Sequence, residues 1–513
     1  MAIATTDAQS ICNMPASDLM SCKPAVTPPD PAPPTATCCS ALSHADMRCL
    51  CSYKNSNLLP SLGIDPKLAM KLPSQCKLPH PANYDPQSSL HQISRDMHSL
   101  DSSSCPIIFA LLLSFFLALS HSLTLQSDIE ALQSLKLSVD PNMIPPSSYL
   151  TTWDFSVDPC ETSGSKFLGI LCSFPSDNST SRITTLELDS VGYDGFLPPR
   201  IGTLTALTSL DLSGNRFRGP VPDSIKNLNR LTRISLSGNF FTGGIWTWIY
   251  RLKKLERINL SGNQLSGRIP ARISKLRRLT HLSLSNNEFS QRIPNLYALE
   301  NLQILELDSN MLTGSLPNLP SRLTTLSLSH NMLTGHITSL VNLEHLVSVD
   351  LSDNLFSGPV NRGVLALPRL THLNVSFNHF TKMEVNNYFG SGSRLQTLAA
   401  QRNRLQGHLP VKLVNLERLT VINLANNQFT GAIPMGYGQR LGRPWRTLFL
   451  DHNYLSGRVP SEFGSAVAKI RGSLANNCLR CPLRIPLCKG RQRPASACHG
   501  YTQNTTNYPK ENY

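Results

Sequence analysis

The sequence predicts an α/β solenoid, a right-handed coil of stacked repeats with a parallel β-sheet on its concave face. Between residues 182 and 460 an Asn returns every 21–26 residues. A fixed frame of apolar residues precedes each Asn, and Gly and Pro follow most of them. Repeats of this length are stacked supersecondary units. The eleven Asn of the series are Asn215, Asn239, Asn263, Asn287, Asn310, Asn331, Asn354, Asn378, Asn403, Asn427 and Asn453.

Each coil has the frame Leu-x-x-Leu-x-x-Leu-x-Leu-x-x-Asn, as in Leu204 to Asn215. Leu210 and Leu212 alternate with polar residues, which predicts a short strand whose apolar side faces into the coil. No coil can bury its own leucines, so stacked coils must share one core. The Asn follows the strand, where its amide can satisfy backbone groups that the turn leaves unpaired. A first, atypical coil has Val191 in the Asn position and fits a terminal cap.

The segments after the Asn follow the pattern Leu-x-Gly-x-Ile/Val/Leu-Pro, for example residues 217–222, 265–270 and 455–460. This pattern resembles the plant-type leucine-rich-repeat proteins, and the resemblance covers residues 127–498. It implies extracellular recognition, because receptor-like proteins, receptor-kinase ectodomains and inhibitors of cell-wall hydrolases share this coil. A membrane receptor kinase is therefore one candidate partner.

We expect an N-terminal cap at residues 127–181, about twelve repeats at 182–460, a C-terminal Cys cap at 461–498 and a disordered tail at 499–513. The N-terminal cap should begin with an amphipathic helix that has Ser127 or Asp128 as its N-cap. Its resemblance to the plant cap implies a Cys160–Cys172 bridge. In the C-terminal cap we favour two disulfides over a zinc site. The cysteines there are Cys478, Cys481, Cys488 and Cys498.

Residues 1–84 carry seven cysteines, with one Cys-Cys doublet followed by a Cys-x-Cys pair. These are Cys12, Cys22, Cys38, Cys39, Cys49, Cys51 and Cys76. The spacing resembles the plant non-specific lipid transfer proteins, above all the variety linked to systemic induced resistance. The resemblance implies a small all-α bundle, stapled by disulfides around a tunnel that holds a fatty acid or lysolipid. The candidate tunnel residues are Leu19, Leu42, Leu50, Leu58, Leu59, Leu62, Ile64, Leu68 and Leu72; ordinary core packing is their alternative role.

This module departs from its family at Tyr84, which occupies the position of the eighth Cys. Cys49 or Cys51 should then remain unpaired. Residues 85–104 are expected to form a linker. Residues 105–122 form an apolar stretch, too short for a membrane span but suited to a signal peptide. A signal peptide in mid-chain suggests two adjoining reading frames, with the second starting at Met97. The alternative is a protein anchored to a membrane through residues 105–120.

The formal net charge is +14, and residues 1–96 contribute none of it because seven Lys and Arg balance seven Asp. A basic secreted solenoid would attract acidic polymers such as pectin. Nucleic acid is a poor partner, since no basic run is interleaved with aromatic residues. The fourteen Cys cluster towards the two ends, which indicates disulfides outside the cytosol.

No catalytic or cofactor-binding motif is present, and the strand histidines His281, His372 and His452 lie on different coils without metal-ligand spacing. We therefore expect neither an enzyme nor a metal site. The favoured function is recognition by the concave face. Lipid transport by the N-terminal module and inhibition of a cell-wall hydrolase are the alternatives.

Four glycosylation sequons begin at Asn178, Asn259, Asn374 and Asn504. Asn259 and Asn374 occupy outward strand positions on coils four and nine, counting the irregular coil as the first. Sugars there would frame coils five to eight, which carry no sequon. We therefore expect ligand contact within this window. Its outward residues are His281, Ser283, Glu306, Asp308, Ser327 and Asp350.

Overall fold

The computed structural model describes residues 10–11, 14–15, 21–27, 31–44, 65–76, 124–161, 166–173, 180–246, 248–385, 393–464, 470–482 and 484–502. The chain divides into two compact units, Met1–His121 and Ser122–Tyr513. Several expected features lie outside the described residues: the linker and apolar stretch at 85–122, the tail beyond residue 502, Tyr84, and the sequons at Asn178 and Asn504.

Within its described residues, the N-terminal unit contains the helices α2 (Ala36–His44) and α5 (Pro66–Gln75) and the shorter η1 (Lys23–Ala25), which disulfides join. Cys22 is bonded to Cys38, and Cys39 is bonded to Cys76. The second helix begins at a proline, which suits the first helical position, and the Asp65 carboxylate accepts from the Leu68 N–H at 3.4 Å. The strands described there are β1 (Ser10–Ile11) and β2 (Met14–Pro15).

A small apolar core lies between these elements. Leu42 and Leu72 are buried in it with Val26, and Leu68 packs against it half-buried. These three leucines are the tunnel candidates that the structure describes. The other tunnel candidates and three of the cysteines lie outside the described residues: Leu19, Leu50, Leu58, Leu59, Leu62, Ile64, Cys12, Cys49 and Cys51.

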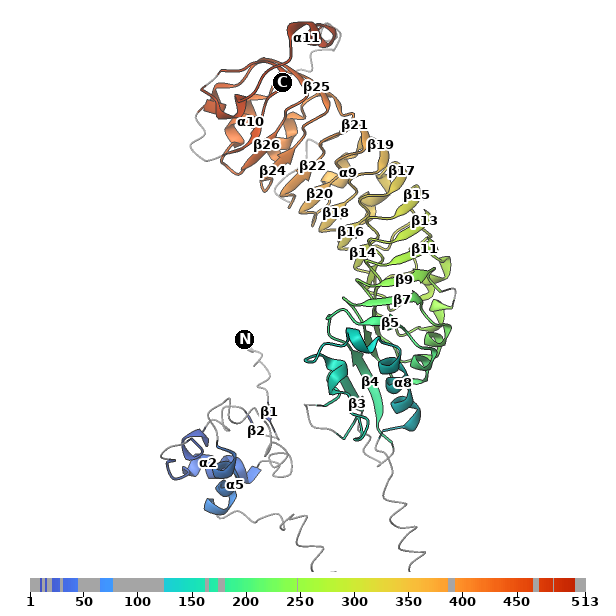
Figure 1. Ribbon diagram of the computed structural model, residues 1–513. Coiled ribbons are helices and arrows are strands. Elements are labelled where there is room, and N and C mark those ends of the chain that lie inside the picture. The colour runs from blue at the N-terminus through green and yellow to red at the C-terminus, as the bar shows by residue number, and fades with distance from the viewer. Residues whose placement is uncertain are drawn as a thin grey trace, which may run out of the picture. The chain divides into compact units, whose positions relative to one another are not determined.

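The second unit is a solenoid, whose strands follow one another along an arc in Figure 1. A 14-stranded sheet lines one face. Its strands are parallel except for β3, which pairs antiparallel with β4 and closes the sheet at the cap. The strands are β3 (Ile170–Ser173), β4 (Arg182–Glu187), β6 (Ser209–Asp211), β8 (Arg233–Ser235), β10 (Arg257–Asn259), β12 (His281–Ser283), β14 (Ile304–Glu306), β16 (Thr325–Ser327), β18 (Ser348–Asp350), β20 (His372–Asn374), β22 (Thr397–Ala399), β24 (Val421–Asn423), β26 (Thr447–Phe449) and β28 (Arg471–Ser473).

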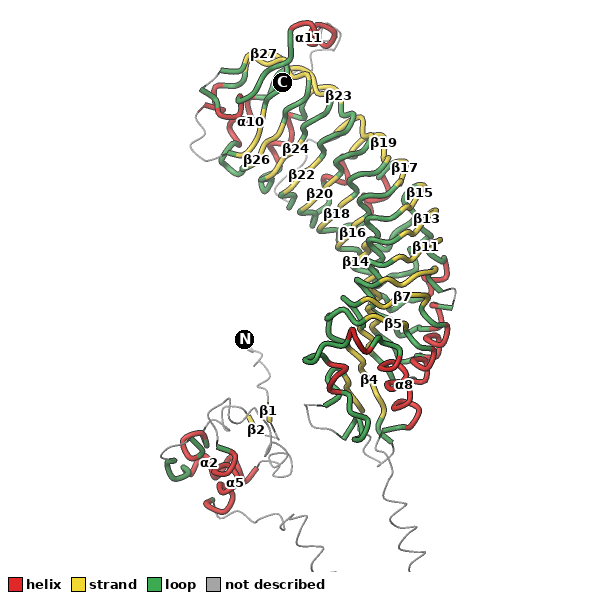
Figure 2. The backbone as a smooth tube through the Cα atoms, viewed as in Figure 1, coloured by secondary structure: helices red, strands yellow, loops and turns green. Residues whose placement is uncertain are grey.

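A second set of strands follows the ladder Asn in each coil and forms a separate edge of the solenoid (Figure 2). It comprises a nine-stranded and a four-stranded sheet. The strands are β5 (Asp194–Phe196), β7 (Arg216–Pro220), β9 (Phe240–Gly243), β11 (Gln264–Arg268), β13 (Glu288–Arg292), β15 (Met311–Gly314), β17 (Met332–Gly335), β19 (Leu355–Val360), β21 (His379–Met383), β23 (Gln406–His408), β25 (Gln428–Gly431), β27 (Tyr454–Arg458) and β29 (Cys478–Arg480).

Short helices connect these strands to the next coil on the convex side. Most begin directly after the Pro of the repeat, because Pro fixes an extended backbone before the turn. The helices of the unit are α8 (Gln126–Leu137), η4 (Pro141–Met143), η5 (Tyr149–Thr152), η6 (Pro199–Thr203), η7 (Asp223–Asn227), η8 (Ile249–Arg251), η9 (Ala271–Lys275), η10 (Thr338–Asn342), α9 (Arg362–Leu365), η11 (Val411–Asn415), α10 (Met435–Arg440), η12 (Ser461–Gly464), η13 (Pro486–Cys488) and α11 (Ala495–Thr502).

The frame leucines form one continuous core through the coils, and most of them are fully buried. Buried phenylalanines after the ladder Asn stack coil on coil, as Phe217 does on Phe241 with ring centres 6.3 Å apart. Stacking therefore extends the core from repeat to repeat, as the pattern predicts.

The N-terminal cap differs from expectation in one respect. Helix α8 begins at Gln126, and its N-cap position, Leu125, makes no side-chain capping bond. Asp128 is instead fully buried and accepts from the Arg182 guanidinium at 2.9 Å and from the Ile183 N–H at 3.1 Å. The prediction of Ser127 or Asp128 as the N-cap was wrong, because Asp128 ties the helix to the first strand of the array.

Disulfides close both ends of the solenoid. Cys160 is bonded to Cys172, Cys478 to Cys498 and Cys481 to Cys488. The parallel sheet also continues past residue 460, since β28 pairs with β26. Among the described residues, no helix has the length and apolar character that crossing a bilayer requires.

Candidate ligand-binding face

The ladder asparagines make the concave face regular. In coil eight the amide nitrogen of Asn354 donates to the carbonyls of Leu328, Leu351 and Ser352, and its oxygen accepts from the Leu333 N–H. Every ladder Asn repeats this pattern, so each coil is held in register with the one before it. The outward side chains are therefore displayed at a fixed spacing of about 4.7–4.9 Å between strands.

Register places the predicted window residues side by side. Ser283 pairs with Glu306, Glu306 with Ser327, and Ser327 with Asp350. These four residues form one row across β12, β14, β16 and β18. The row ends at Asn374 on β20, which pairs with Asp350.

The other two window residues flank this row. His281 lies at the start of β12 and pairs with Ile304. Asp308 follows β14 and accepts from the Ser285 hydroxyl at 2.6 Å. All six window residues are half-buried on an open surface, so a ligand could reach them without a conformational change.

The two carboxylates of the row, Asp350 and Glu306, differ in the number of hydrogen bonds that they accept from the protein. Asp350 accepts from the Ser352 N–H at 2.9 Å, from the Ser352 hydroxyl at 2.6 Å and from the Asn374 amide at 3.0 Å. Glu306 has no such bond within the described part of the chain. Glu306 is thus the carboxylate that is better placed to pair with a ligand.

His281 is the histidine of the window, and its ordinary pKa of 6.5 lies close to neutral pH. Its ring nitrogen Nδ1 lies 2.8 Å from the Thr280 hydroxyl. Burial lowers the pKa of His281 first, and the positive charge of Arg257 lowers it further, while Glu306 acts in the opposite direction. The ring is therefore mainly neutral at pH 7, so it offers hydrogen bonds rather than a charge.

Asn259 and Asn374 lie on the concave strands at the two borders of the window. Each side-chain oxygen accepts from the hydroxyl of the Ser two residues later, at 2.7 Å in both cases. No hydrogen bond of the Asn259 amide nitrogen to another described residue accompanies them. The Asn374 nitrogen already bonds Asp350.

A rim of residues beside the window was not anticipated. The residue before each ladder Asn has a positive φ, and in coils seven to nine these residues are His330, Asp353 and Phe377. The His330 ring nitrogen lies 3.6 Å from an Asp353 carboxylate oxygen. Phe377 is 42% exposed and carries the Arg402 guanidinium 5.0 Å from its ring centre. Their fixed position before the Asn is the signal that could have revealed them.

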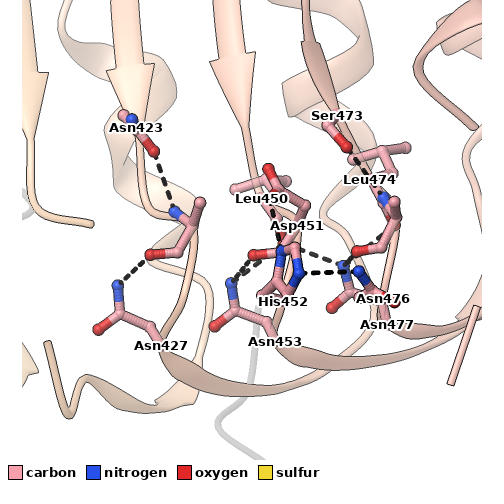
Figure 3. A network of polar contacts seen from close by, with 12 residues as sticks. Asn423, Asn427, Leu450, Asp451, His452, Asn453, Ser473, Leu474, Asn476 and Asn477 are labelled. Atoms are coloured by element: carbon pink, nitrogen blue, oxygen red, sulfur yellow. Dashed lines mark hydrogen bonds and ion pairs between the residues drawn. The ribbon is translucent and has the colours of Figure 1, made fainter. Parts of the chain in front are cut away.

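A polar network continues the ladder at the C-terminal end (Figure 3). His452 bonds the Asp451 carboxylate at 2.8 Å and the Asn476 amide at 2.8 Å. Asn477 repeats the ladder pattern, donating to Leu450 and Leu474 carbonyls. These bonds join the last two coils, so the network has a structural role.

Two open hollows lie away from the concave window. One, of about 1200 Å³, is lined by residues near the C-terminal cap, including Met435, Arg458 and Arg480. The other, of about 580 Å³, is lined by Asp194, Arg218 and Phe240 on the second set of strands. Within the described ranges, no three His, Cys, Asp or Glu side chains are grouped as a metal site would require. Neither hollow is lined by a residue of the concave window.

Comparison with known proteins assigns both units. A family model for probable lipid transfer matches residues 1–84. A leucine-rich-repeat N-terminal domain matches residues 125–173, and leucine-rich-repeat models match residues 206–228, 231–289, 301–323 and 322–343. The putative lipid-transfer protein DIR1 of Arabidopsis thaliana is 50% identical over 78 residues, which are 15% of this chain and 76% of that protein.

The chain carries an N-terminal module of the lipid-transfer family, and its second unit contains leucine-rich repeats behind a leucine-rich-repeat N-terminal domain. Receptor-like protein 41 of Arabidopsis thaliana is 34% identical to this leucine-rich-repeat protein over 75 residues, 15% of the chain but only 8% of the relative. The match thus spans a small part of that receptor-like protein.

Solved structures of plant receptors also resemble the array. A plant peptide hormone receptor, RGFR1 in complex with RGF2, is 26% identical over 58% of this chain and 57% of that chain, with a TM-score of 0.48. A TDR receptor is 24% identical over 59% of this chain and 67% of that chain, with a TM-score of 0.46.

Proposed function

We propose that this leucine-rich-repeat protein is a secreted, non-enzymatic recognition protein that binds an extended peptide or protein segment along coils five to eight. The observation that carries the proposal is the in-register row Ser283, Glu306, Ser327 and Asp350. An extended chain laid across adjacent strands would meet these side chains one after another. The disulfides at both ends of the array support a location outside the reducing cytosol.

The window favours a partner with positive charge. Glu306, Asp308 and Asp350 are separated by serines, and the strands β14, β16 and β18 carry no Lys or Arg, although the exposed Arg322 lies three residues before β16. Opposite charges raise the rate of encounter and suppress partners of the wrong sign. The sugars expected on Asn259 and Asn374 would limit the ligand to the stretch between them.

The first experiment tests whether Asn259 and Asn374 are glycosylated and then whether a peptide binds between them. Glycopeptide mass spectrometry of the secreted protein establishes whether Asn259 and Asn374 carry sugar. An array of synthetic extended peptides, half of them with paired Lys or Arg, is then screened with the full-length protein. The strongest peptide is titrated against Glu306→Lys, which replaces the least engaged carboxylate.

We expect Glu306→Lys to weaken the peptide at least about tenfold, equivalent to about 1.4 kcal/mol. The control is Asp211→Lys, which makes the same change at the same strand position on coil two, outside the window. An unchanged affinity for Glu306→Lys, or an equal loss for Asp211→Lys, would contradict the placement.

A second function belongs to the lipid-transfer module, and the buried Leu42, Leu72 and half-buried Leu68 favour it. We propose that this core forms part of an acyl-chain site. A fluorescent fatty acid added to the full-length protein should show saturable binding that Leu72→Glu abolishes. Lys71→Glu, at the exposed neighbouring position, should bind normally; equal behaviour of the two variants would refute a site at Leu72.

A further inference from the structure

The positive charge of the array is concentrated on three consecutive coils. Residues 223–292 contain thirteen Lys and Arg against three Asp and Glu, although the whole chain has a net charge of only +14. The excess therefore lies mostly in coils three to five. Such a local concentration raises the electrostatic potential of one surface rather than of the whole molecule.

Part of this charge forms an ordered surface, which we call the basic block: Arg230, Arg233, Lys254, Arg257 and Arg278. Arg233 pairs in register with Arg257, and Arg257 with His281. Arg230, Lys254 and Arg278 each precede these three strand residues by three positions. The block is therefore two parallel rows that run across the coils.

Backbone hydrogen bonds fix the spacing of the two rows. The Glu256 N–H donates to the Thr232 carbonyl at 2.8 Å, and the Thr280 N–H donates to the Glu256 carbonyl at 2.8 Å. These bonds lie between the two rows in each coil. The backbones of neighbouring strands, which carry Arg233 and Arg257, are thus about 4.7–4.9 Å apart.

The block has a gap on each side. In coil two the corresponding positions are Ala206 and Ser209, and in coil six they are Asn301 and Ile304. Beyond coil six the row of Arg230, Lys254 and Arg278 alone resumes, with Arg322, which donates to the Asn301 side chain at 3.4 Å. All five cations are exposed, and none forms an ion pair with a described carboxylate. Glu256 is the acidic side chain within the block, and it too is exposed. Packing of the solenoid therefore does not account for these charges.

From this arrangement we infer that the basic block binds a linear acidic polysaccharide with a carboxylate on each sugar. The cations repeat at one spacing on a rigid sheet, and such a polymer repeats its charges in the same way. Affinity then comes from the sum of equivalent ion pairs rather than from a shaped pocket, and the two hollows described above lie elsewhere.

Single-stranded nucleic acid binds by stacking its bases on exposed rings, and the strands of the block, β8, β10 and β12, contain no Phe, Tyr or Trp. The Trp and Tyr residues of these coils lie instead in the convex connection around η8. Trp246 and Trp248 stack on each other with ring centres 5.1 Å apart, and the Trp248 indole N–H donates to Asp223 at 2.7 Å. Tyr250 is covered by the Arg272 guanidinium, 5.1 Å from its ring centre. These rings are already occupied by contacts within the protein.

The test uses the full-length protein and polygalacturonate, with the fully methyl-esterified polymer as the uncharged form of the same backbone. The variant is Arg230→Glu/Lys254→Glu/Arg278→Glu. The matched control is Arg458→Glu/Arg480→Glu/Arg484→Glu, which reverses three exposed charges near the C-terminal cap. Melting temperatures of both variants verify that the fold is kept.

We expect polygalacturonate to bind, with an affinity that falls as salt rises, and the esterified polymer not to bind. The basic-block variant should lose at least about tenfold in affinity, the equivalent of about 1.4 kcal/mol, and the control less than about twofold. Equal losses in the two variants would overturn the site. Equally tight binding of polyglutamate or single-stranded DNA would overturn the assignment to a polysaccharide.

The basic block shares no residue with the row Ser283, Glu306, Ser327 and Asp350, so the two binding experiments fail separately. A sugar on Asn259, two residues after Arg257 on β10, would border both sites. Glu306→Lys should leave polygalacturonate binding unchanged or slightly stronger, since it adds a positive charge. The basic-block variant leaves Ser283, Glu306, Ser327 and Asp350 in place. Loss of peptide binding alone would therefore leave the polysaccharide site standing.

Discussion

At the scale of single residues, the buried ladder Asn is the most constrained position in the array. A side chain that satisfies three carbonyls and one N–H cannot be replaced without leaving polar backbone groups unpaired in the core. Asn453 and Asn477 are fully buried, eight further ladder Asn are at most 9% exposed, and Asn263 and Asn310 are half-buried. Water therefore has little access to compensate for a lost amide.

Replacing Asn354 by Ala should reduce the free energy of unfolding by about 1–3 kcal/mol, because the Leu328, Leu351 and Ser352 carbonyls lose their donor. The measurement is thermal or urea unfolding of the full-length protein. Asn342→Ala, at an exposed position of η10, should change it by less than about 0.5 kcal/mol. Similar effects of the two changes would show that the ladder amides contribute little.

His281 should titrate below its ordinary pKa of 6.5 in an NMR experiment. Arg257→Gln should raise that pKa and Glu306→Gln should lower it, because these changes remove the positive and negative neighbours. A shift of either variant in the other direction would contradict this electrostatic account.

The pKa of His281 also has a consequence for stability. The unfolded chain takes up the proton first as pH falls, so His281 costs stability progressively below pH 6.5. His281→Gln should remove this part of the pH dependence.

At the scale of the repeat element, the turn before the ladder Asn requires a left-handed backbone. Gly occupies it in coils two to four, as Gly214, Gly238 and Gly262, with φ between 62° and 68°. Later coils place side chains there at similar φ, for example Ser309 at 55°. The later turns thus carry a conformational cost that the earlier ones avoid.

Ser309→Gly should therefore stabilise the protein by up to about 1 kcal/mol, because relief of left-handed strain exceeds the added entropy of the unfolded chain. Ser309→Val should destabilise it, since a β-branched residue tolerates this region poorly. The control is Ser327→Gly on strand β16, which should lose stability. Unfolding midpoints measured side by side decide the matter, and equal effects at the two serines would refute the argument.

At the scale of the whole molecule, two units of different character share one chain. The lipid-transfer module is a small helical body that depends on disulfides, because a core of its size supplies little stability alone. The array gains its stability from neighbouring coils instead. The apolar stretch at 105–122 lies between them in sequence, and the proposal of two adjoining reading frames concerns this junction.

Sequencing of transcripts across codons 80–110 tests that proposal. If the chain is a fusion of two frames, reads should stop or start near codon 97 and should not cross the junction. Uninterrupted reads, together with a single secreted product of about 56.5 kDa, would establish one protein. An immunoblot that detects each unit provides an independent control, because it shows whether the two units share one band or run as two separate products.

The sequence by itself determined the solenoid, the parallel pairing of strands from successive coils and the row of window residues. These follow from a one-dimensional pattern, because each coil contacts its neighbours at fixed offsets. The same reasoning placed Asn259 and Asn374 on the concave strands. The lipid-transfer module could be inferred only through its cysteine spacing, since its leucines have no comparable period.

Tertiary structure alone decided the features that depend on contacts beyond this pattern. The sequence did not predict Asn477 as a ladder Asn, because Gly472 stands where the frame has Leu. In the structure, a Cβ on residue 472 would lie 1.9 Å from the Leu448 carbonyl oxygen, so only Gly fits there. The local sequence predicts Asp128 as a helix cap, because its actual partner, Arg182, is 54 residues away and cannot be identified from the helix alone. The alignment of the basic block follows from the same 24-residue repeat as the window, but the structure alone shows that its five cations are exposed and form no ion pair with a described carboxylate.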